Sequence, residues 1–399
     1  MNIIIAGATF PCGAGELGEV ARRHGLVPTF LDHPHNKILS ENMLSSMIIG
    51  DGVPDALALQ HGLFLPLLES WVSAGIRLTE GNALRFDRRA ASISRSKVEL
   101  SATLADADLC HVPRHGASTL NDALRAGSSC GYPVVLRADT GYSGRGVWVA
   151  ESADDLRSLW SRQSAEQTSS HFAEMRSVMK ADADVSVIEP WLSSREWSID
   201  CIVGPAGAYL IRVCEKATGV VFGRPVTLGY RLTTDTDLWA EIDAAARKWC
   251  GVLFRPNELS FACFDIRRHP SGDLVPLDFG VRLGGDCIPL LVRHAGQGRN
   301  PYAAALDASL AGEPSRMILP EAGHALIHAY AHRPGVYNGL HVVGHGVVVN
   351  SKEHGFAIAQ QHGVPVPRRV GSVLTYFDSL EEFDHTCATS SEWLHVVLL

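Results

Sequence analysis

The stretch FACFDIRRHPSGDLVPLDFGVRLGGD, residues 261 to 286, has an apolar run on each side of the turn signal Ser271-Gly272. Two such runs around a short turn predict a β-hairpin. Counting outward from Ser271-Gly272, Asp265 on the first strand faces Asp278 on the second. We therefore expect two carboxylates to oppose each other on one face of a sheet.

Opposed carboxylates are unfavourable in an antiparallel pair, because their Cβ atoms lie roughly 5 Å apart and like charges repel. Two arrangements would relieve the repulsion: one carboxylate is protonated, or a divalent cation lies between them. Mg²⁺ prefers oxygen ligands and commonly takes the remaining ones from nucleotide phosphates. If the pairing is out of register by one residue, one aspartate faces solvent instead. The sequence leaves these alternatives open.

A second stretch, LRADTGYSGRGVWVA, residues 136 to 150, has three glycines between two apolar runs. Gly141 and Gly146 have the spacing of a P-loop, but Val147 and Trp148 stand where that loop has Lys and Ser or Thr. The segment predicts either an ordinary hairpin or a glycine-rich loop that binds phosphate through backbone N–H groups. In the second case, Ser143 and nearby arginines would assist.

The composition favours small-molecule partners. The 399 residues carry a formal net charge of −8 without a run of Lys or Arg, which argues against nucleic acid. No apolar stretch is long enough to span a membrane. The nine cysteines are scattered without a C-x-x-C pair, which argues against a disulfide framework. The start, MNIIIAGATF, is typical of a first strand rather than a secretory signal, so we expect a cytoplasmic protein.

The order of segments predicts an α/β fold with several domains. Strand-like NIIIAG, TFLD and SMIIG alternate with the helical GELGEVARRHG, as in an open, partly parallel sheet. Further signals predict a helix capped by Ser152, a hairpin of EWSIDCIV and AYLIRVC, a helix that ends at Gly251 and a helix that begins at Asn300-Pro301. The expected divisions are an N-terminal α/β domain, two central parts and a small C-terminal α/β domain, at residues 1–94, 95–187, 188–315 and 316–399.

Over roughly residues 85 to 312, the ordered series of motifs resembles the ATP-grasp superfamily, specifically its carboxylate–amine ligases. SRSKVELSATL has a Lys at the opening of a helix, VIEPWLSSREWSID is similar to the adenine hinge, and CEKATG has a Lys after a strand. The resemblance implies an ATP-grasp fold preceded by the open α/β domain, with ATP and one or two Mg²⁺ ions as cofactors. The implied ATP-binding residues are Lys97, Arg137, Ser143, Gly144, Gly146, Glu189, Trp191, Leu192, Glu196 and Lys216. The implied metal ligands are Asp265 and Asp278, and the implied catalytic residues are Arg282 and Lys216.

The chain departs from the family pattern at two positions. Arg137 stands where the family has a Lys, which keeps the charge but changes the geometry. Gly280 stands where the family has an Asn ligand, so a second Mg²⁺ would need Asp286 or water. Arg282 is retained, and by resemblance it would hold the acyl phosphate or the tetrahedral intermediate.

The resemblance implies an ADP-forming ligase that activates a carboxylate as an acyl phosphate and joins it to an amine, giving an amide or dipeptide bond. The alternatives are an acid–thiol ligase or carboxylase of the same superfamily, and a nicotinamide-dependent oxidoreductase. The oxidoreductase would use the G-x-G-x-x-G match of Gly13, Gly15 and Gly18 with Asp32. That fingerprint needs its first glycine at the turn after the strand, and here five residues intervene.

Some residues outside these motifs have competing interpretations. Three histidines, His324, His328 and His332, recur every four residues, and we expect satisfied or surface histidines rather than a zinc site. Cys287 is expected to be a buried structural thiol. The first domain could form a symmetric homodimer. Candidates for binding a substrate carboxylate are Arg212, Arg293 and Arg299.

Overall fold

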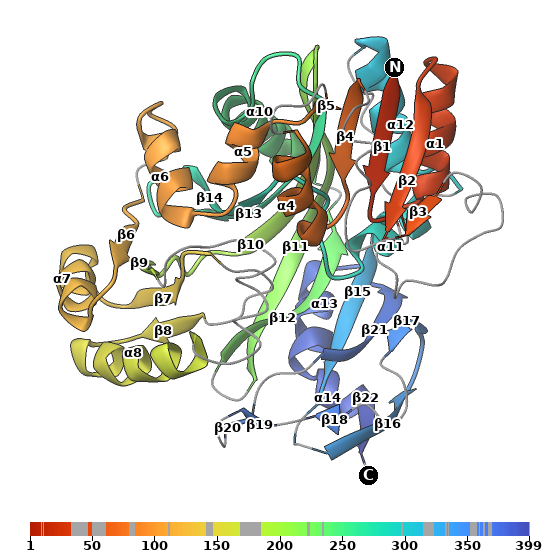
Figure 1. Cartoon of the computed structure of the whole chain (residues 1–399). Helices are drawn as coiled ribbons and strands as arrows, with labels where there is room; N and C mark the ends of the chain where they lie inside the picture. The colour runs from red at the N-terminus through yellow and green to blue at the C-terminus, as the bar shows by residue number, and fades with distance from the viewer. Residues whose placement is uncertain are drawn as a thin grey trace.

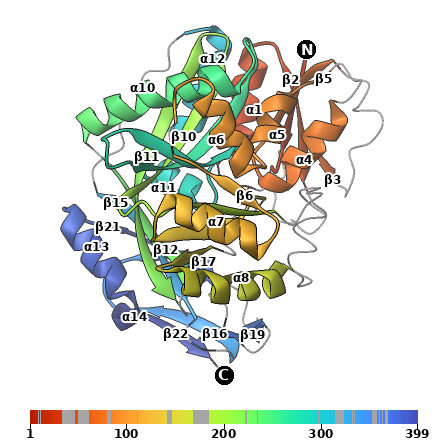
Figure 2. The same cartoon turned by 90° about the vertical axis from the view of Figure 1, so that its left-hand side faces the viewer.

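The computed structural model describes residues 1–8, 10, 12–32, 47–49, 61–79, 84–110, 112–140, 147–167, 185–221, 224–233, 235–296, 298–313, 323–331, 333, 335–351, 357–358, 360–361, 364–365 and 369–398. The chain forms a five-stranded N-terminal sheet, a four-stranded sheet, a central eight-stranded sheet and a smaller group of C-terminal strands. Figures 1 and 2 show the four-stranded sheet and its helices standing out from the central sheet, with the termini at opposite ends of the molecule.

The N-terminal sheet is parallel, in the strand order β3-β2-β1-β4-β5. Ile3, Ile4 and Ile5 on its central strand are completely buried, as expected when helices cover both faces of a parallel sheet. The predicted open α/β sheet is therefore confirmed. Its strands are β1 (Asn2–Ala6), β2 (Val27–Asp32), β3 (Met47–Ile49), β4 (Gly62–Pro66) and β5 (Leu84–Arg85), with helices α1 (Ala14–Arg23) and α4 (Glu69–Leu78).

Two short helices, α5 (Arg88–Ile93) and α6 (Lys97–Ala105), lead to the four-stranded antiparallel sheet. Its strands bury Val134, Leu136 and Ile188 in one apolar cluster with side chains of the two helices that pack on the sheet. Ser152 caps a helix as predicted, because its Oγ accepts from the Asp155 N–H at 3.2 Å. The elements are β6 (His115–Ala117), α7 (Leu120–Cys130), β7 (Val134–Ala138), β8 (Trp148–Ala150), α8 (Ala153–Gln167) and β9 (Ser186–Pro190).

The central sheet is antiparallel and has the order β14-β13-β10-β11-β12-β15-β21-β17. The predicted hairpin of β10 and β11 is present. The strands are β10 (Glu196–Gly204), β11 (Gly207–Val221), β12 (Arg224–Leu232), β13 (Ser260–Arg268), β14 (Leu274–Gly280), β15 (His324–Tyr330), β17 (Val347–Ser351) and β21 (Arg369–Tyr376). Its helices are α10 (Thr236–Leu253), α11 (Ile288–Ala295) and α12 (Pro301–Ala311).

Helix α10 covers one face of this sheet with apolar side chains, among them Trp239, Ile242 and Trp249. The helix ends at Leu253 rather than at the predicted Gly251, because Leu253 is itself completely buried and extends the packed face. Helix α12 begins as predicted, with the Asn300 side chain accepting from the Tyr302 N–H at 3.1 Å.

The hairpin of β13 and β14 places Asp265 directly opposite Asp278. The turn itself differs from the prediction, because His269 and Asp273 already pair, with the His269 N–H donating to the Asp273 carbonyl at 2.8 Å. That turn alone would offset the aspartates by one residue. A bulge at Leu277, between the pairs Asp265–Asp278 and Ile266–Pro276, restores their alignment.

The register aligns polar residues in rows on the face of the central sheet opposite α10. Residues that pair directly share a face. One row contains Arg267, Glu196, Lys216 and Tyr230; the next contains Asp278, Asp265 and Ser198; a third contains Asp200 and Arg212. We call this surface the polar face.

The C-terminal segment continues the central sheet, because β15 pairs with β12 and then with β21. Beyond it lie β16 (Gly335–Val342), β18 (Ala357–Ile358), β19 (Gln360–Gln361), β20 (Val364–Pro365), α13 (Leu380–Ala388), α14 (Ser390–Trp393) and β22 (Leu394–Leu398). Within the described ranges, every helix is too short or too polar to span a membrane.

Candidate active site

Asp265 and Asp278 lie at the centre of the polar face and are partly exposed, 31% and 37% at the side chain. Lys216 donates from Nζ to Asp265 Oδ2 at 2.9 Å and also pairs with Glu196. Burial would raise the pKa of Asp265, but the Lys216 ammonium outweighs it and holds that pKa below its ordinary value. The Asp265 carboxylate is therefore ionised and is held in place by Lys216.

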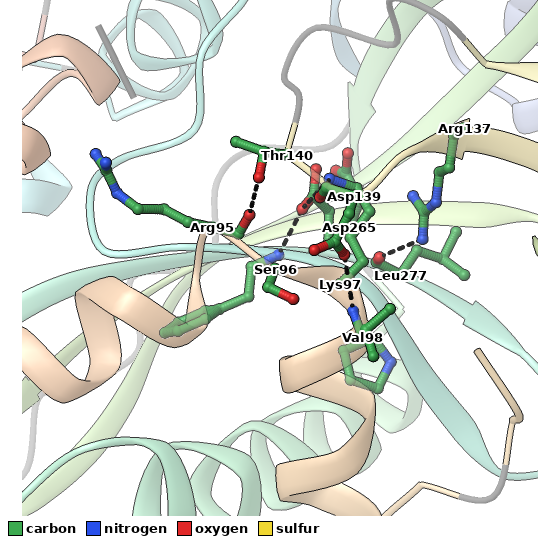
Figure 3. A network of polar contacts seen from close by, with 12 residues as sticks. Arg95, Ser96, Lys97, Val98, Arg137, Asp139, Thr140, Asp265 and Leu277 are labelled. Atoms are coloured by element: carbon green, nitrogen blue, oxygen red, sulfur yellow. Dashed lines mark hydrogen bonds and ion pairs between the residues drawn. The ribbon is translucent and has the colours of Figure 1, made fainter. Parts of the chain in front are cut away.

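A second lysine approaches the aspartates from outside the sheet (Figure 3). Lys97 is the first residue of α6, which is capped by Ser96, and its Nζ donates to the Asp139 carbonyl at 3.1 Å. The same Nζ lies 3.7 Å from Asp278 Oδ1. Burial lowers the pKa of Lys97, although Asp278 opposes that shift. Three strands and a helix thus bring Lys97, Lys216 and both aspartates into one cluster.

Glu189 on β9 is buried between two arginines. Arg114 donates from Nε to one carboxylate oxygen, and Arg137 from Nη2 to the other, each at 2.7 Å. Burial would raise the pKa of Glu189, but Arg137 and Arg114 together lower it. Arg137 also donates to the Leu277 carbonyl at 2.8 Å, next to Asp278 (Figure 3). The bulge at Leu277 therefore ties the four-stranded sheet to the aspartate hairpin.

The segment between β9 and β10 contains the expected hinge residues. Arg267 stacks over the Trp191 ring at 4.5 Å, donates to the Leu192 carbonyl and pairs with Glu196 at 3.0 Å. The Trp191 N–H donates to the Pro133 carbonyl at 3.0 Å. Glu196, expected on the ribose hydroxyls, thus lies between Arg267 and Lys216 in the same row of the sheet.

Arg282 follows β14 and connects the central sheet to the N-terminal domain. Its Nε donates to Glu69 Oε2 at 2.7 Å, and its Nη1 donates to the Leu283 carbonyl at 2.6 Å. Glu69 is the first residue of α4, at the carboxyl end of the parallel sheet. Burial would lower the pKa of Arg282, but the half-buried Cys263 and Glu69 raise it above its ordinary value, so the guanidinium is permanently charged.

Asp286 does not lie where it would replace a missing metal ligand. Arg369 donates from Nη1 to Asp286 Oδ1 at 2.5 Å, and the Tyr230 hydroxyl donates to Oδ2 at 3.0 Å. Both carboxylate oxygens are therefore used within a neighbouring cluster.

The aspartate pair supplies at most part of the ligand set that a metal ion needs. Among the residues that the structure describes, no group of three or more His, Cys, Asp or Glu is arranged to hold a metal ion. Two opposed carboxylates supply hard oxygen donors that suit Mg²⁺, with the remaining positions left for phosphate oxygens and water. The donor set therefore fits a Mg²⁺–nucleotide rather than a metal held by protein alone.

Other residues considered from the sequence lie elsewhere. Arg212 is 1% exposed and paired with Asp200 at 2.7 Å, so it cannot meet a substrate carboxylate. Arg293 and Arg299 line a cavity of about 290 Å³ beside α1, where Arg293 pairs with Glu16 at 2.8 Å. Ser143, Gly144 and Gly146 of the glycine-rich segment, and His332, lie outside the described residues.

The remaining alternatives fall on α1 and β15. Gly13 is the N-cap of α1, separated from the end of β1 at Ala6, so it does not form the turn that a dinucleotide fingerprint requires. His328 is buried and hydrogen bonded to Ser372 Oγ at 2.9 Å, in agreement with a satisfied histidine. Cys287 is only half-buried and is the N-cap of α11.

Solved structures of other proteins share this arrangement of strands and helices. An L-amino acid ligase from Bacillus licheniformis superimposes over 100% of this chain and 98% of its own, with a TM-score of 0.72 at 16% identity. The chain has the ATP-grasp fold. Residues 96–181 match the family model of the carbamoyl-phosphate synthase L chain ATP-binding domain.

Further ATP-grasp structures are similar at lower scores. A phosphoribosylamine–glycine ligase from Thermotoga maritima covers 99% of this chain and 97% of its own, with a TM-score of 0.61 at 15% identity. A biotin carboxylase domain from Hydrogenobacter thermophilus, solved with MgADP, covers 100% and 90%, with a TM-score of 0.62 at 12% identity. Both the expected superfamily resemblance and the expected fold are confirmed.

A curated relative matches over a shorter region. The formate-dependent phosphoribosylglycinamide formyltransferase of Pseudomonas fluorescens (strain Pf0-1) is 25% identical over 161 residues. The match covers 37% of this chain and 41% of that protein, so it spans less than half of either.

Several residues of the site escaped the sequence analysis. They are Arg114, Asp139, Arg267, Glu69 and Arg369. Arg267 had a signal, since it lies two residues after Asp265 on the same strand face. The others come from distant segments, and only the tertiary fold brings them to the polar face.

Proposed function

We propose that the chain is an ATP-dependent, ADP-forming ligase that joins a carboxylate to an amine. The observation that carries the proposal is the opposition of Asp265 and Asp278 between Lys97 and Lys216. Paired carboxylates can bind a divalent metal ion, and two neighbouring lysines can bind the phosphates of the nucleotide that carries it. The ATP-grasp fold and the ligases among its solved relatives support the same assignment.

The proposed chemistry begins with a carboxylate, which is a poor electrophile because its leaving group would be oxide. Transfer of the γ-phosphoryl group of ATP to a carboxylate oxygen gives an acyl phosphate and ADP. Attack by an amine then forms the C–N bond and expels phosphate, with loss of a proton from nitrogen. Mg²⁺ bound at Asp265 and Asp278 would supply charge neutralisation for the phosphates.

The other roles follow from position. Lys97, Arg137 and Lys216 would bind phosphate oxygens, Glu196 the ribose, and Trp191 and Leu192 the adenine. Glu189 would act through Arg137, which it holds beside the aspartates. Ser143, Gly144 and Gly146 would close over the phosphates and exclude water. The two central parts of the chain would then enclose the nucleotide.

The carboxylate to be activated would lie near Arg282. The first domain has the strand order β3-β2-β1-β4-β5, whose direction of connection reverses between β1 and β4. Ligands of open α/β sheets bind at the carboxyl ends of strands at such a switch point. Glu69 lies at that end and holds the Arg282 guanidinium, which could then stabilise the tetrahedral intermediate.

The test is an assay of ADP and phosphate release from ATP and Mg²⁺ with a panel of carboxylic acids, with and without amines. We expect ADP release that depends on an acid, together with formation of an amide. Thiols in place of amines, or bicarbonate as the acid, would reveal the thiol ligase or carboxylase instead.

The variant Asp265→Asn should lower kcat at least a hundredfold without changing the melting temperature by more than a few degrees. Asp243→Asn is a matched control, because Asp243 is similarly exposed at 29% and pairs with Arg247 on α10. Equal activity of Asp265→Asn and Asp243→Asn would remove Asp265 from the site. Absence of acid-dependent ADP release over the whole panel would reject the ligase.

A further inference from the structure

The cluster around Arg369 is not used by the proposed nucleotide chemistry. Arg369 on β21 pairs with Asp286, which follows β14 in the chain, and Tyr230 on β12 donates to the same carboxylate. Tyr230 pairs directly with Lys216 in the sheet, so this cluster borders the lysine–aspartate cluster. The two clusters together form a continuous charged surface on the polar face.

The ion pair of this cluster is partly exposed to solvent, and the residues that support it are buried. The Asp286 and Arg369 side chains are 28% and 29% exposed. Tyr230 and His328, which support them, are 3% and 1% exposed. An ion pair that is half-open above a buried floor can accept a ligand without any change in the floor.

Arg369 has donors to spare. Its Nη1 binds Asp286 and lies 3.5 Å from His328 Nε2. In the described part of the chain, its Nε and Nη2 make no hydrogen bond. A guanidinium has five N–H donors in a planar fork, and this shape matches a carboxylate at two points. Asp286 fixes one edge of the fork and leaves the other for an anion.

A carboxylate bound there would not be the one that is activated. Tyr230 lies on β12 and Asp265 on β13, and two strands, β11 and β10, separate them. Three strand spacings separate the backbones of β12 and β13 by about 14 Å, and Arg369 lies on β21, farther still from β13. The group bound by Arg369 is therefore a second carboxylate, at a distance from the phosphates that an amino acid or a short diacid could span.

We propose that Arg369, oriented by Asp286, anchors a non-reacting carboxylate of one of the two substrates. The inference rests on the proposed ligase function. The carboxylate belongs either to the amine substrate, as in an α-amino acid, or to the distal end of a dicarboxylic acid. The recognition chemistry is the same in both cases.

The first step of the experiment tests the ligase function alone. Hydroxylamine serves as a small amine without a carboxylate, and the wild-type protein is given ATP, Mg²⁺ and monocarboxylic acids, L-amino acids or dicarboxylic acids. Formation of hydroxamate with any of them establishes acid activation. If no hydroxamate or ADP forms, the proposed function fails and the anchor fails with it.

The second step tests the anchor in the wild-type protein. One arm compares amino acids with their amides as amine substrates, and the other compares dicarboxylic acids with their monoamides as acids. We expect at least a tenfold higher KM in one arm when the carboxylate is replaced. Equal KM values in both arms, with hydroxamate formation intact, would overturn the anchor and leave the ligase standing.

The third step uses the variant Arg369→Gln, with Arg369→Lys as the charge-retaining form. In the arm that discriminates, Arg369→Gln should raise the KM of the carboxylate-bearing substrate at least tenfold and leave its amide and ATP unchanged. Arg369→Lys should recover part of the loss, because it keeps the charge but lacks the fork. A rise in KM that is the same for the amide would overturn the proposal.

Arg195→Gln is the matched control. Arg195 pairs with Asp384 at 3.1 Å, is 30% exposed and joins the central sheet to α13, so it resembles Arg369 in burial and in linking the C-terminal segment. Loss of this ion pair should leave the discrimination between carboxylate and amide intact. If Arg195→Gln removes the discrimination equally, general loosening of the C-terminal segment explains the effect and the anchor is rejected.

Discussion

His328 is a buried histidine whose charge is decided by its surroundings. Its Nδ1 lies 2.9 Å from Ser372 Oγ, and its Nε2 faces Arg369. Burial lowers the pKa of His328 to about 3, Arg369 adds to that shift, and Asp286 opposes it. The imidazole is therefore neutral in the folded protein and keeps the floor beneath Arg369 free of a second positive charge.

This shift makes the stability of the protein depend on pH. The pKa of His328 is 6.5 when unfolded and about 3 when folded, so below pH 6.5 the unfolded chain binds the proton that the folded one excludes. The contribution is complete above pH 6.5 and is lost as the pH falls toward 3. Between pH 6.5 and 5, the loss from this group should reach about 2 kcal/mol.

Urea unfolding of the wild type and of His328→Gln at pH 7, 6 and 5 measures this contribution. The wild type should lose more stability over that range than His328→Gln does. His385→Gln, which alters an exposed histidine on α13, should behave like the wild type. Parallel pH profiles for all three proteins would show that folding does not lower the pKa of His328.

The sequence predicted those site residues that lie close together in the chain. It missed those whose contacts join segments far apart in the chain. Asp265 and Asp278 follow from counting along one hairpin. The pairing of Arg114 with Glu189 and of Glu69 with Arg282 joins residues far apart in the chain. No periodicity or turn signal encodes such a contact, because it exists only once the sheets are packed.

The loop between β14 and α11 is hydrogen bonded to one buried carboxylate, that of Asp200. Asp200 accepts from Arg212 at 2.7 and 3.0 Å, from the Tyr302 hydroxyl at 2.8 Å and from the Gly284 N–H at 2.8 Å. Later in the same loop, Asp286 has a φ of 58°, which is uncommon for a residue other than glycine. The loop that contains Arg282 and Asp286 is therefore fixed in one conformation.

Gly284→Ala should disturb this loop. A Cβ at Gly284 would lie 2.2 Å from Arg212 Nη2, and Arg212 cannot retreat because it is buried and paired with Asp200. We expect a drop in kcat of at least tenfold and a loss of stability of about 2 kcal/mol. Steady-state kinetics and thermal unfolding measure the two effects.

The neighbouring glycine provides the control. A Cβ at Gly285 has no atom within 4 Å, so Gly285→Ala should retain activity. If both alanine variants are equally active, contact with Arg212 does not constrain the loop.

At the level of elements, most strands and helices were predictable, because alternation and capping residues are local signals. The caps at Ser152 and Asn300 were correct. The bulge at Leu277 was not predicted, because its carbonyl is fixed by Arg137 from another sheet. The aspartates were correctly paired even though the turn was not.

The whole molecule depends on a few polar contacts between its parts. Arg282 and Glu69 join the central sheet to the N-terminal domain, with side chains only 18% and 15% exposed. Arg293 and Glu16 join the same two parts at 2.8 Å, but with exposures of 37% and 47%. The two pairs thus differ mainly in their access to water.

Glu69→Gln should weaken the hold on Arg282 without changing the shape of the site. We expect kcat to fall about tenfold, the KM for ATP to stay constant and stability to fall by about 2 kcal/mol, since a buried charge loses its partner. Glu16→Gln should have little effect on any of these, because exposed ion pairs contribute little. Identical kinetics for both variants would mean that Glu69 does not position Arg282.

The pairing of β15 with β12 limits how the C-terminal segment can be exchanged for that of another protein. Gly229, Tyr230 and Arg231 are hydrogen bonded to the strand that opens the C-terminal segment. A chimera joined just before residue 323 would need a donor strand of matching register, or the unpaired edge would promote aggregation. The C-terminal segment is thus not an interchangeable module, and recombination within this architecture should succeed only where that ladder is inherited intact.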